Sequence, residues 1–249
     1  MKRNRYFFEI VLVIASMIFL SPVLQAAEDP QDIKGCPEGT TCTAVEISTA
    51  ELKQILTEGK TPVIDVRPSK EYAISHIPGS VSIFETDIDE MAKATPDKSF
   101  GPVLYCNGPF CHKTVRVAEK LSQKGYTNIK KYQHGVPVWR AFGNTAETSL
   151  SGFQYVYMLD KTAVFVDARS KDEFKTGTLT GAVSIHQASE IEAANNDGRL
   201  PYTDHGTRVI VFGSSIAQAR KLAEAIAQRA YWNSSYLAGT YEDLKKTGL

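Results

Sequence analysis

The chain has 249 residues, of which 43% are hydrophobic and 22% are charged, and its 28 basic side chains are matched by 28 acidic ones. This mixture is typical of a folded protein and argues against a disordered, collagen-like or coiled-coil chain. The balanced charge gives no basic face for a nucleic acid, and the length suits two domains of ~100 to 150 residues that each bury a core.

Residues 1–26 have the layout of a secretory signal peptide. A basic start over residues 2–5 precedes an apolar stretch over residues 7–20, and small or apolar residues stand before the expected cleavage after Ala26. An uncleaved membrane anchor is the alternative, but the apolar stretch is shorter than the ~20 residues that span a bilayer. We therefore expect an exported protein, periplasmic or secreted, without stable membrane association after cleavage.

An N-terminal arm over residues 27–45 follows the expected cleavage site. Its two cysteines, Cys36 and Cys42, are separated by a turn-forming sequence with proline and glycine. Because an exported protein meets an oxidising compartment, we expect a structural disulfide between them. A loop this short contributes ~2 kcal/mol of chain-entropy stabilisation, and its effect would be to fasten the arm.

From this point the chain repeats itself at an offset of 102 residues. Residues 63–67 and 165–169 both read as short strands that end in Asp-x-Arg, and the pattern Gly-x-Val-Ser-Ile recurs at residues 79–83 and 181–185. A match that keeps one offset over several segments is not an accident of composition. It indicates two copies of one domain.

The two copies are expected at residues 46–146 and 147–249, joined near the polar residues 144–149. In the first copy, strands alternate with amphipathic helices. The expected strands are residues 62–66, 81–83, 103–105 and 129–132, and helices are expected to begin at the capping box of Ser48 and at Thr114. This alternation predicts an α/β fold in which each domain is a parallel sheet flanked by helices on both faces, with ligands bound at the carboxyl ends of the strands.

The segment after the third expected strand carries the chemistry. Cys106 ends that strand, and the residues after it lead into the helix that begins at Thr114. Main-chain amides and the helix dipole at such a helix start stabilise negative charge. We therefore expect a lowered pKa of the Cys106 thiol and an anion beside it. From position alone, a buried structural cysteine is an equal alternative.

Three segments of the first copy resemble the rhodanese-like sulfurtransferase family: the opening residues 63–80, the cysteine loop with its helix at residues 105–126, and the closing motif at residues 135–139. The resemblance covers nearly all of the mature chain as a tandem pair with the first copy active. It implies that Cys106 is the catalytic nucleophile, which passes a sulfane sulfur from a small donor anion or persulfide to a thiol-type acceptor without a cofactor. It also implies a set of loop residues that bind the substrate, namely Asn107, Gly108, Pro109, Phe110, Cys111, His112 and Lys113.

The loop departs from the family pattern in its length and in its second thiol. Cys106 to Thr114 spans eight steps, which could admit a donor bulkier than thiosulfate. His112 stands where related phosphatases carry an arginine that grips an oxyanion, so phosphatase activity is not expected. Cys111 could form a disulfide with Cys106, resolve a persulfide on it, or pack at the helix start. These side chains offer at most three metal ligands, so no metal site is expected.

The second copy lacks the nucleophile. Gly213 aligns with Cys106, and Ser214 and Ser215 are expected to cap the following helix. We expect this domain to be structural and to shape the approach to Cys106. Scaffold roles, in a buried ion pair or a cap, are expected for Asp65, Arg67 and His76.

Three functions remain open from the sequence. The first is sulfur transfer through Cys106, the second is a thiol redox protein that cycles a Cys106–Cys111 disulfide, and the third is a non-catalytic binding or sensor module. The sequence carries no signal for an oligomeric state.

Overall fold

A computed structural model describes residues 44–99 and 101–249 of the chain. The predicted signal peptide and the Cys36–Cys42 pair lie outside these residues. Within the described ranges, no helix combines the length and the apolar character needed to cross a bilayer.

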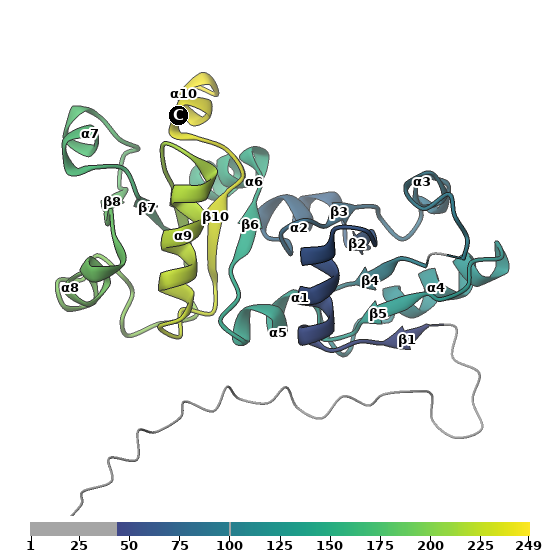
Figure 1. Ribbon diagram of the computed structural model, residues 1–249. Helices are drawn as coiled ribbons and strands as arrows, with labels where there is room; N and C mark the ends of the chain where they lie inside the picture. The colour runs from purple at the N-terminus through teal and green to yellow at the C-terminus, as the bar shows by residue number, and fades with distance from the viewer. Residues whose placement is uncertain (1–43, 100) are drawn as a thin grey trace, which may run out of the picture. The chain divides into compact units, whose positions relative to one another are not determined.

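Two five-stranded parallel sheets organise the described residues (Figure 1). The first has the strand order β1-β5-β4-β2-β3, and the second repeats this order as β6-β10-β9-β7-β8. The strands of the first sheet are β1 (Val45–Glu46), β2 (Val63–Asp65), β3 (Val81–Ser82), β4 (Val103–Tyr105) and β5 (Lys130–Tyr132). Those of the second are β6 (Ala146–Thr148), β7 (Ala163–Asp167), β8 (Val183–Ser184), β9 (Arg208–Phe212) and β10 (Ser234–Leu237). The predicted pair of α/β domains is confirmed.

Helices flank the sheets, as the alternating pattern predicts. The first domain contains α1 (Thr49–Glu58), α2 (Ser69–Ile74), α3 (Ile88–Ala94), α4 (Lys113–Gln123) and α5 (Gly135–Ala141). The second contains α6 (Leu150–Tyr155), the π-helical turn η1 (Val156–Asp160), α7 (Lys171–Thr176), the 3-10 turn η2 (Ala188–Glu190), α8 (Ile191–Asn196), α9 (Ile216–Ala227) and α10 (Tyr241–Lys246). The capping box predicted at Ser48 is confirmed, since its hydroxyl accepts from the Glu51 amide while the Glu51 carboxylate accepts from the Ser48 amide.

Side chains alternate along each strand, and this alternation decides toward which face of the sheet each side chain points. In β4, Leu104 packs with side chains of α3 and α4, whereas Val103 and Tyr105 pack with side chains of α1 and α5. Successive residues of a strand point to opposite faces, so Cys106 shares the face of Leu104. Its side chain is only 2% exposed and joins the apolar cluster beneath α4.

The predicted junction between the domains is itself part of the second sheet, because residues 146–148 form its edge strand β6. This strand also touches the first domain. His76 and Glu147 form an antiparallel bridge with two backbone hydrogen bonds of 2.9 Å, and the Ser149 amide donates to the Ala73 carbonyl. At Gly152, a Cβ atom would overlap the Ala73 carbonyl, so only glycine permits this approach.

Candidate active site

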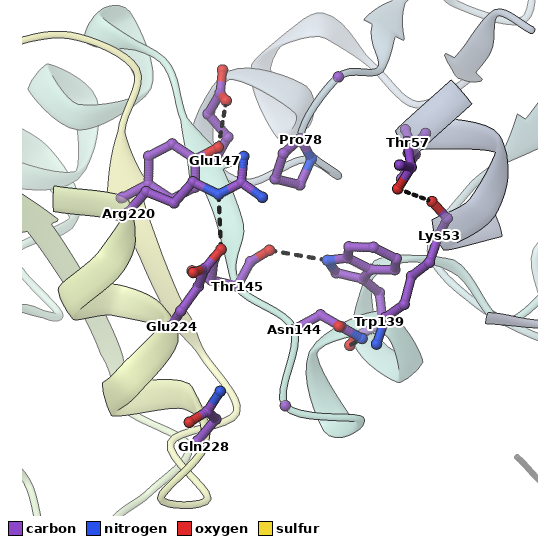
Figure 2. Close-up of a pocket in the computed structure, with 14 residues that line it drawn as sticks. Lys53, Thr57, Pro78, Trp139, Asn144, Thr145, Glu147, Arg220, Glu224 and Gln228 are labelled. Atoms are coloured by element: carbon purple, nitrogen blue, oxygen red, sulfur yellow. Dashed lines mark hydrogen bonds and ion pairs between the residues drawn. The ribbon is translucent and has the colours of Figure 1, made fainter. Parts of the chain in front are cut away.

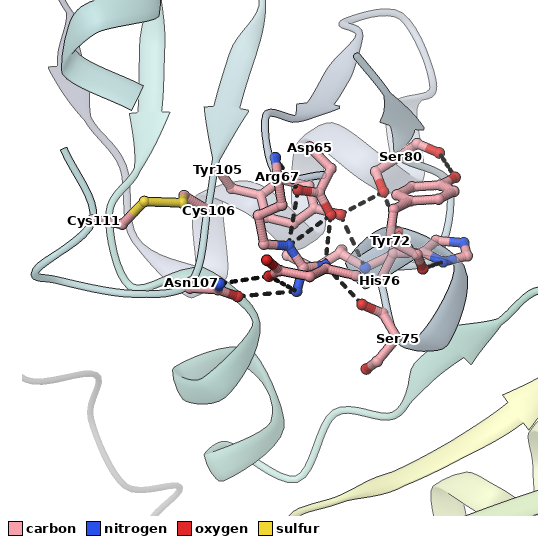
Figure 3. Close-up of polar contacts among 12 residues, drawn as sticks. Asp65, Arg67, Tyr72, Ser75, His76, Ser80, Tyr105, Cys106, Asn107 and Cys111 are labelled. Atoms are coloured by element: carbon pink, nitrogen blue, oxygen red, sulfur yellow. Dashed lines mark hydrogen bonds and ion pairs between the residues drawn. A yellow bond between two sulfur atoms is a disulfide. The ribbon is translucent and has the colours of Figure 1, made fainter. Parts of the chain in front are cut away.

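The reactive-loop cysteines form a disulfide at the end of β4 (Figure 3). The Sγ atoms of Cys106 and Cys111 are bonded, and the two Cα atoms lie 6.3 Å apart. Cys106 is buried, whereas Cys111 is partly exposed. Of the roles open to Cys111 from the sequence, the structure shows that of a disulfide partner. The expected nucleophile is therefore present in its oxidised state.

The amide cradle expected around the Cys106 sulfur is not formed in this oxidised state. Within the described ranges, no hydrogen bond reaches that sulfur, which is bonded to Cys111, and the Cys106 side chain packs in one apolar cluster with Ile64 and Leu104. The Cys111 amide, one of the expected donors, instead closes a turn by donating to the Gly108 carbonyl at 2.9 Å. The reason is strand alternation, which turns the side chain at position 106 toward the core.

The start of α4 nevertheless keeps the character of an anion site. This helix has eleven residues, and His112 at its N-cap makes no side-chain hydrogen bond to the first amides. The first amides of a helix lack intrahelical acceptors, and the helix dipole favours negative charge beside them.

The predicted substrate-binding residues fall into an exposed group and an anchored group. Asn107, Pro109, Phe110 and His112 are exposed, and Phe110 is 93% exposed. Gly108 is buried, and its φ of 119° lies in the region that favours glycine. The loop therefore presents its tip to solvent and holds its base inside the protein.

Lys113 forms an ion pair with Glu85, so its ammonium group is not a free positive charge beside the loop. Its ammonium lies 2.5 Å from one Glu85 oxygen, and Arg116 lies 2.7 Å from the other. The hydrogen bond from Lys113, supported by Arg116, lowers the pKa of Glu85 below its ordinary value. Lys113, one of the predicted substrate-binding residues, is therefore paired with a carboxylate.

Asn107 connects the loop to a polar network at the carboxyl end of β2 (Figure 3). Its side-chain oxygen accepts from Arg67 at 3.0 Å, and its amide nitrogen donates to Glu71 at 2.6 Å. Arg67 in turn pairs with the fully buried Asp65, 2.6 Å from Nη2 to Oδ2. The predicted buried ion pair of Asp65 and Arg67 is confirmed, and it positions Asn107.

His76, the third expected scaffold residue, is also buried. Its Nδ1 lies 2.8 Å from the Tyr72 carbonyl, and its Nε2 lies 3.4 Å from Glu147. The bond to His76 is the main cause that lowers the pKa of Glu147 below its ordinary value. This residue links β6 to the first domain and takes no part in the cysteine loop.

The Gln133 side chain supports the loop through hydrogen bonds. The sequence alone did not predict this role. Its side-chain nitrogen donates to three loop carbonyls, at 2.9 Å to Pro109, 3.1 Å to Cys111 and 3.4 Å to Gly108. Its oxygen accepts from Thr114 at 3.0 Å. The available signal was positional: Gln133 directly follows β5, which neighbours β4, and the carboxyl ends of parallel strands share one edge of a sheet.

Gly135 makes room for the loop backbone. Its φ is 64°, and a Cβ atom there would overlap the carbonyl of Cys106 and the amide of Gly108. The next residue, Val136, donates its amide to the Cys106 carbonyl at 3.3 Å. The glycine that opens the closing motif is therefore required by the close approach of two backbones.

The second domain offers no equivalent nucleophile. Gly213 occupies the position that aligns with Cys106, and a Cβ there would lie 2.7 Å from the Gln218 oxygen. Ser215 caps α9 as predicted. Ser214 does not, because its hydroxyl donates to Glu173 at 3.0 Å.

A larger cavity, of about 590 Å³, has a different lining (Figure 2). Its polar lining is internally paired: Tyr236 donates to Glu147 at 2.8 Å, and Arg220 pairs with Glu224 at 2.8 Å. The described lining contains no cysteine. Among residues 44–99 and 101–249, no group of three or more His, Cys, Asp or Glu residues is arranged to hold a metal ion. Cys106 and Cys111 lie instead in the loop after β4.

The sequence profile of the rhodanese-like domain matches the chain twice, over residues 48–142 and 154–247. The chain belongs to the rhodanese-like family. The tandem arrangement expected from the sequence agrees with this double match, and the family includes sulfurtransferases that act between a sulfur donor and a thiol acceptor.

Individual relatives match parts of the chain. The HTH-type transcriptional regulator Rv0324 of Mycobacterium tuberculosis is 31% identical over 140 residues, which are 55% of this chain and 55% of the regulator. This chain thus spans about half the length of that curated relative.

Solved structures give similar but partial matches. A thiosulfate sulfurtransferase from Pseudomonas aeruginosa is 19% identical, with 80% of this chain and 43% of that chain covered and a TM-score of 0.38. A rhodanese with anions from E. coli is 32% identical, with 30% of this chain and 86% of that chain covered and a TM-score of 0.27.

Proposed function

We propose that the protein is an exported sulfurtransferase that carries a sulfane sulfur as a persulfide on Cys106. One observation carries the proposal: Cys106 stands at the carboxyl end of β4, and the loop of residues 107–112 leads from it to the uncapped start of α4, in a chain of the rhodanese-like family. Reduction would free the Cys106 side chain from Cys111, and the released thiolate would then turn from the apolar cluster toward the first amides and the dipole of α4, which stabilise negative charge.

The reaction begins with reduction of the Cys106–Cys111 disulfide by an external dithiol, which becomes a disulfide itself. The Cys106 thiolate then attacks the outer sulfur of a donor such as thiosulfate. A sulfur–sulfur bond forms on Cys106, the sulfur–sulfur bond of the donor breaks, and sulfite leaves with the electron pair. A thiolate acceptor finally takes the outer sulfur of the persulfide and regenerates the Cys106 thiolate.

A sulfur-transfer assay with reductant present tests the proposal, with thiosulfate, polysulfide and thiosulfonate as donors. Cys106→Ser should abolish turnover with each donor. Cys111→Ser is the matched control, because it removes the other loop thiol, and it should retain turnover and lose the requirement for prior reduction. Full turnover by Cys106→Ser with every donor would refute the proposal.

The disulfide itself favours a second candidate function, in which Cys106 and Cys111 act as a redox pair. A Cys111 thiolate that attacks the inner sulfur of a Cys106 persulfide would form the observed disulfide and expel hydrosulfide. The sulfane sulfur would be reduced, the two thiols would be oxidised, and an external dithiol would restore them. Thiol counting after equilibration with glutathione buffers distinguishes this function, because a cycling pair titrates as a two-electron couple.

Export and a purely binding role have separate tests. Mass spectrometry of the unreduced protein from the periplasm or medium would show cleavage after Ala26, any Cys36–Cys42 link and any additional sulfur on Cys106. A reduced protein that turns over no donor would point instead to a binding role. That role is consistent with the similarity to a protein named as a transcriptional regulator.

A further inference from the structure

A second cavity, of about 210 Å³, lies next to the reactive loop and is rich in arginine. Its polar lining consists of Arg67, Glu71, Ser75, Asn107, Arg140 and Arg208. Three guanidinium groups and one carboxylate thus face a single small space. The described residues around this cavity do not include Cys106, so it is separate from the position of the reactive sulfur.

Arg67 is largely committed to the protein, because four of its five N–H donors already have acceptors. Its Nε and Nη2 bind Asp65, its Nη2 also donates to the Ser75 carbonyl at 2.7 Å, and its Nη1 donates to Asn107 at 3.0 Å. Glu71 is likewise held by Asn107. Arg67 and Glu71 therefore form the fixed wall of the cavity.

Arg140 is different, because it has no carboxylate partner among the described side chains. Its Nη1 donates to Asn233 at 2.5 Å and weakly to Ser75 at 3.4 Å, and both partners are neutral. Burial, together with the nearby charges of Arg208 and Arg67, lowers the pKa of Arg140 to about 10. A positive charge in this setting is stabilised by an anion.

Arg208 enters the same cavity from the second domain, at the first residue of β9. Its Nη1 pairs with Asp160 at 2.7 Å. Its Nε, however, is buried and has no acceptor in the part of the chain that the structure describes. A buried donor without an acceptor destabilises the folded protein, so an acceptor in the cavity would be favoured.

We propose that Arg140 and Arg208 together bind a small oxyanion in this cavity, of the sulfate, sulfite or carboxylate class. Two guanidinium groups provide planar, directed donors that match the oxygen atoms of such an anion. The cavity of about 210 Å³ has room for an anion of this size, and the negative charge of Glu71 favours binding at the Arg140–Arg208 end. Because these arginines come from different domains, the anion would bridge the two domains beside Asn107.

This site does not depend on the proposed sulfur transfer. An anion held here is a bound group rather than the group that is transferred, since the described cavity lining lacks the reactive sulfur. A negative sulfur-transfer assay would therefore not refute the anion site. A negative sulfate titration would not refute sulfur transfer through Cys106.

Calorimetric titration with sodium sulfate, at an ionic strength held constant with sodium chloride, tests the site. We expect one saturable site per chain, and we expect Arg140→Gln and Arg208→Gln each to weaken sulfate binding at least tenfold. Arg229→Gln is the matched control, because it removes the same charge from an exposed position in the second domain, and it should bind as the wild type does.

Two results would overturn the site. The first is no saturable binding by the wild type, and the second is equal binding by the Arg140→Gln and Arg208→Gln variants, which would place the anion elsewhere, for example at the start of α4. Thermal unfolding without sulfate should show that Arg140→Gln is at least as stable as the wild type, because the substitution removes a buried charge that has no carboxylate partner among the described side chains. If that variant is unstable, Arg208→Gln alone decides the question.

Discussion

Replacing Gln133 by glutamate should disable the reactive loop while leaving the fold intact. The Gln133 side chain donates to the carbonyls of Pro109 and Cys111 at 2.9 and 3.1 Å and, more weakly, to that of Gly108. A carboxylate at this position has the same shape but no donor, and it would turn negative charge toward three carbonyl oxygens. The bond from Thr114 can persist, because glutamate still accepts it.

The expected magnitude follows from the two short bonds. Each is worth ~1 kcal/mol, so their loss should raise the barrier to sulfur transfer by ~2 kcal/mol if the loop must be ordered in the transition state. This corresponds to a fall of about 30-fold in kcat/KM. The melting temperature should change little, because the tip of the loop is exposed and the Pro109 carbonyl can bind water instead.

The assay is sulfur transfer under reducing conditions, paired with the pH dependence of Cys106 alkylation in a Cys111→Ser background. A loosened loop should move the alkylation profile to higher pH as well as lower kcat/KM. Gln54→Glu is the matched control, since it makes the same change on the exposed surface of α1. A Gln133→Glu protein within twofold of wild-type kcat/KM, with an unshifted alkylation profile, would refute the reasoning.

Three further outcomes concern stability. Cys111→Ser should lower the free energy of unfolding of the oxidised protein by ~2 kcal/mol, the chain-entropy contribution of a link across 5 residues, and an unchanged urea midpoint would contradict this. Glu147 has a pKa below 4.5, so its contribution is present above pH 4.5 and is lost as pH falls toward its folded pKa. Glu147→Gln should therefore flatten the acid limb of melting temperature against pH. Gly152→Ala should destabilise the protein by ~1–3 kcal/mol, measured by urea unfolding, because its Cβ meets a carbonyl.

The amino-acid sequence was sufficient to predict the tandem α/β architecture. The repeat at an offset of 102 residues, the strand-and-helix alternation and the capping box at Ser48 depend on local patterns, and local patterns are readable from one chain. The same holds for the Asp65–Arg67 pair, whose members are two residues apart. The position of Cys106 at a strand end was readable for the same reason.

Contacts between distant segments were decided only by the tertiary structure. The edge strands β1 and β6 are too short to give a periodic signal, and they are strands only because β5 and β10 pair with them. Gln133 can bond to the loop because β5 pairs with β4. Arg140 and Arg208 line the same cavity because the two domains pack against each other. The inward turn of the Cys106 sulfur likewise follows from the phase of strand alternation, which places position 106 on the side of α4 and brings Cys111 within bonding reach. Patterns along the chain thus determine the elements and the reactive residue, while its redox partner, its support and the neighbouring anion site depend on how those elements pack.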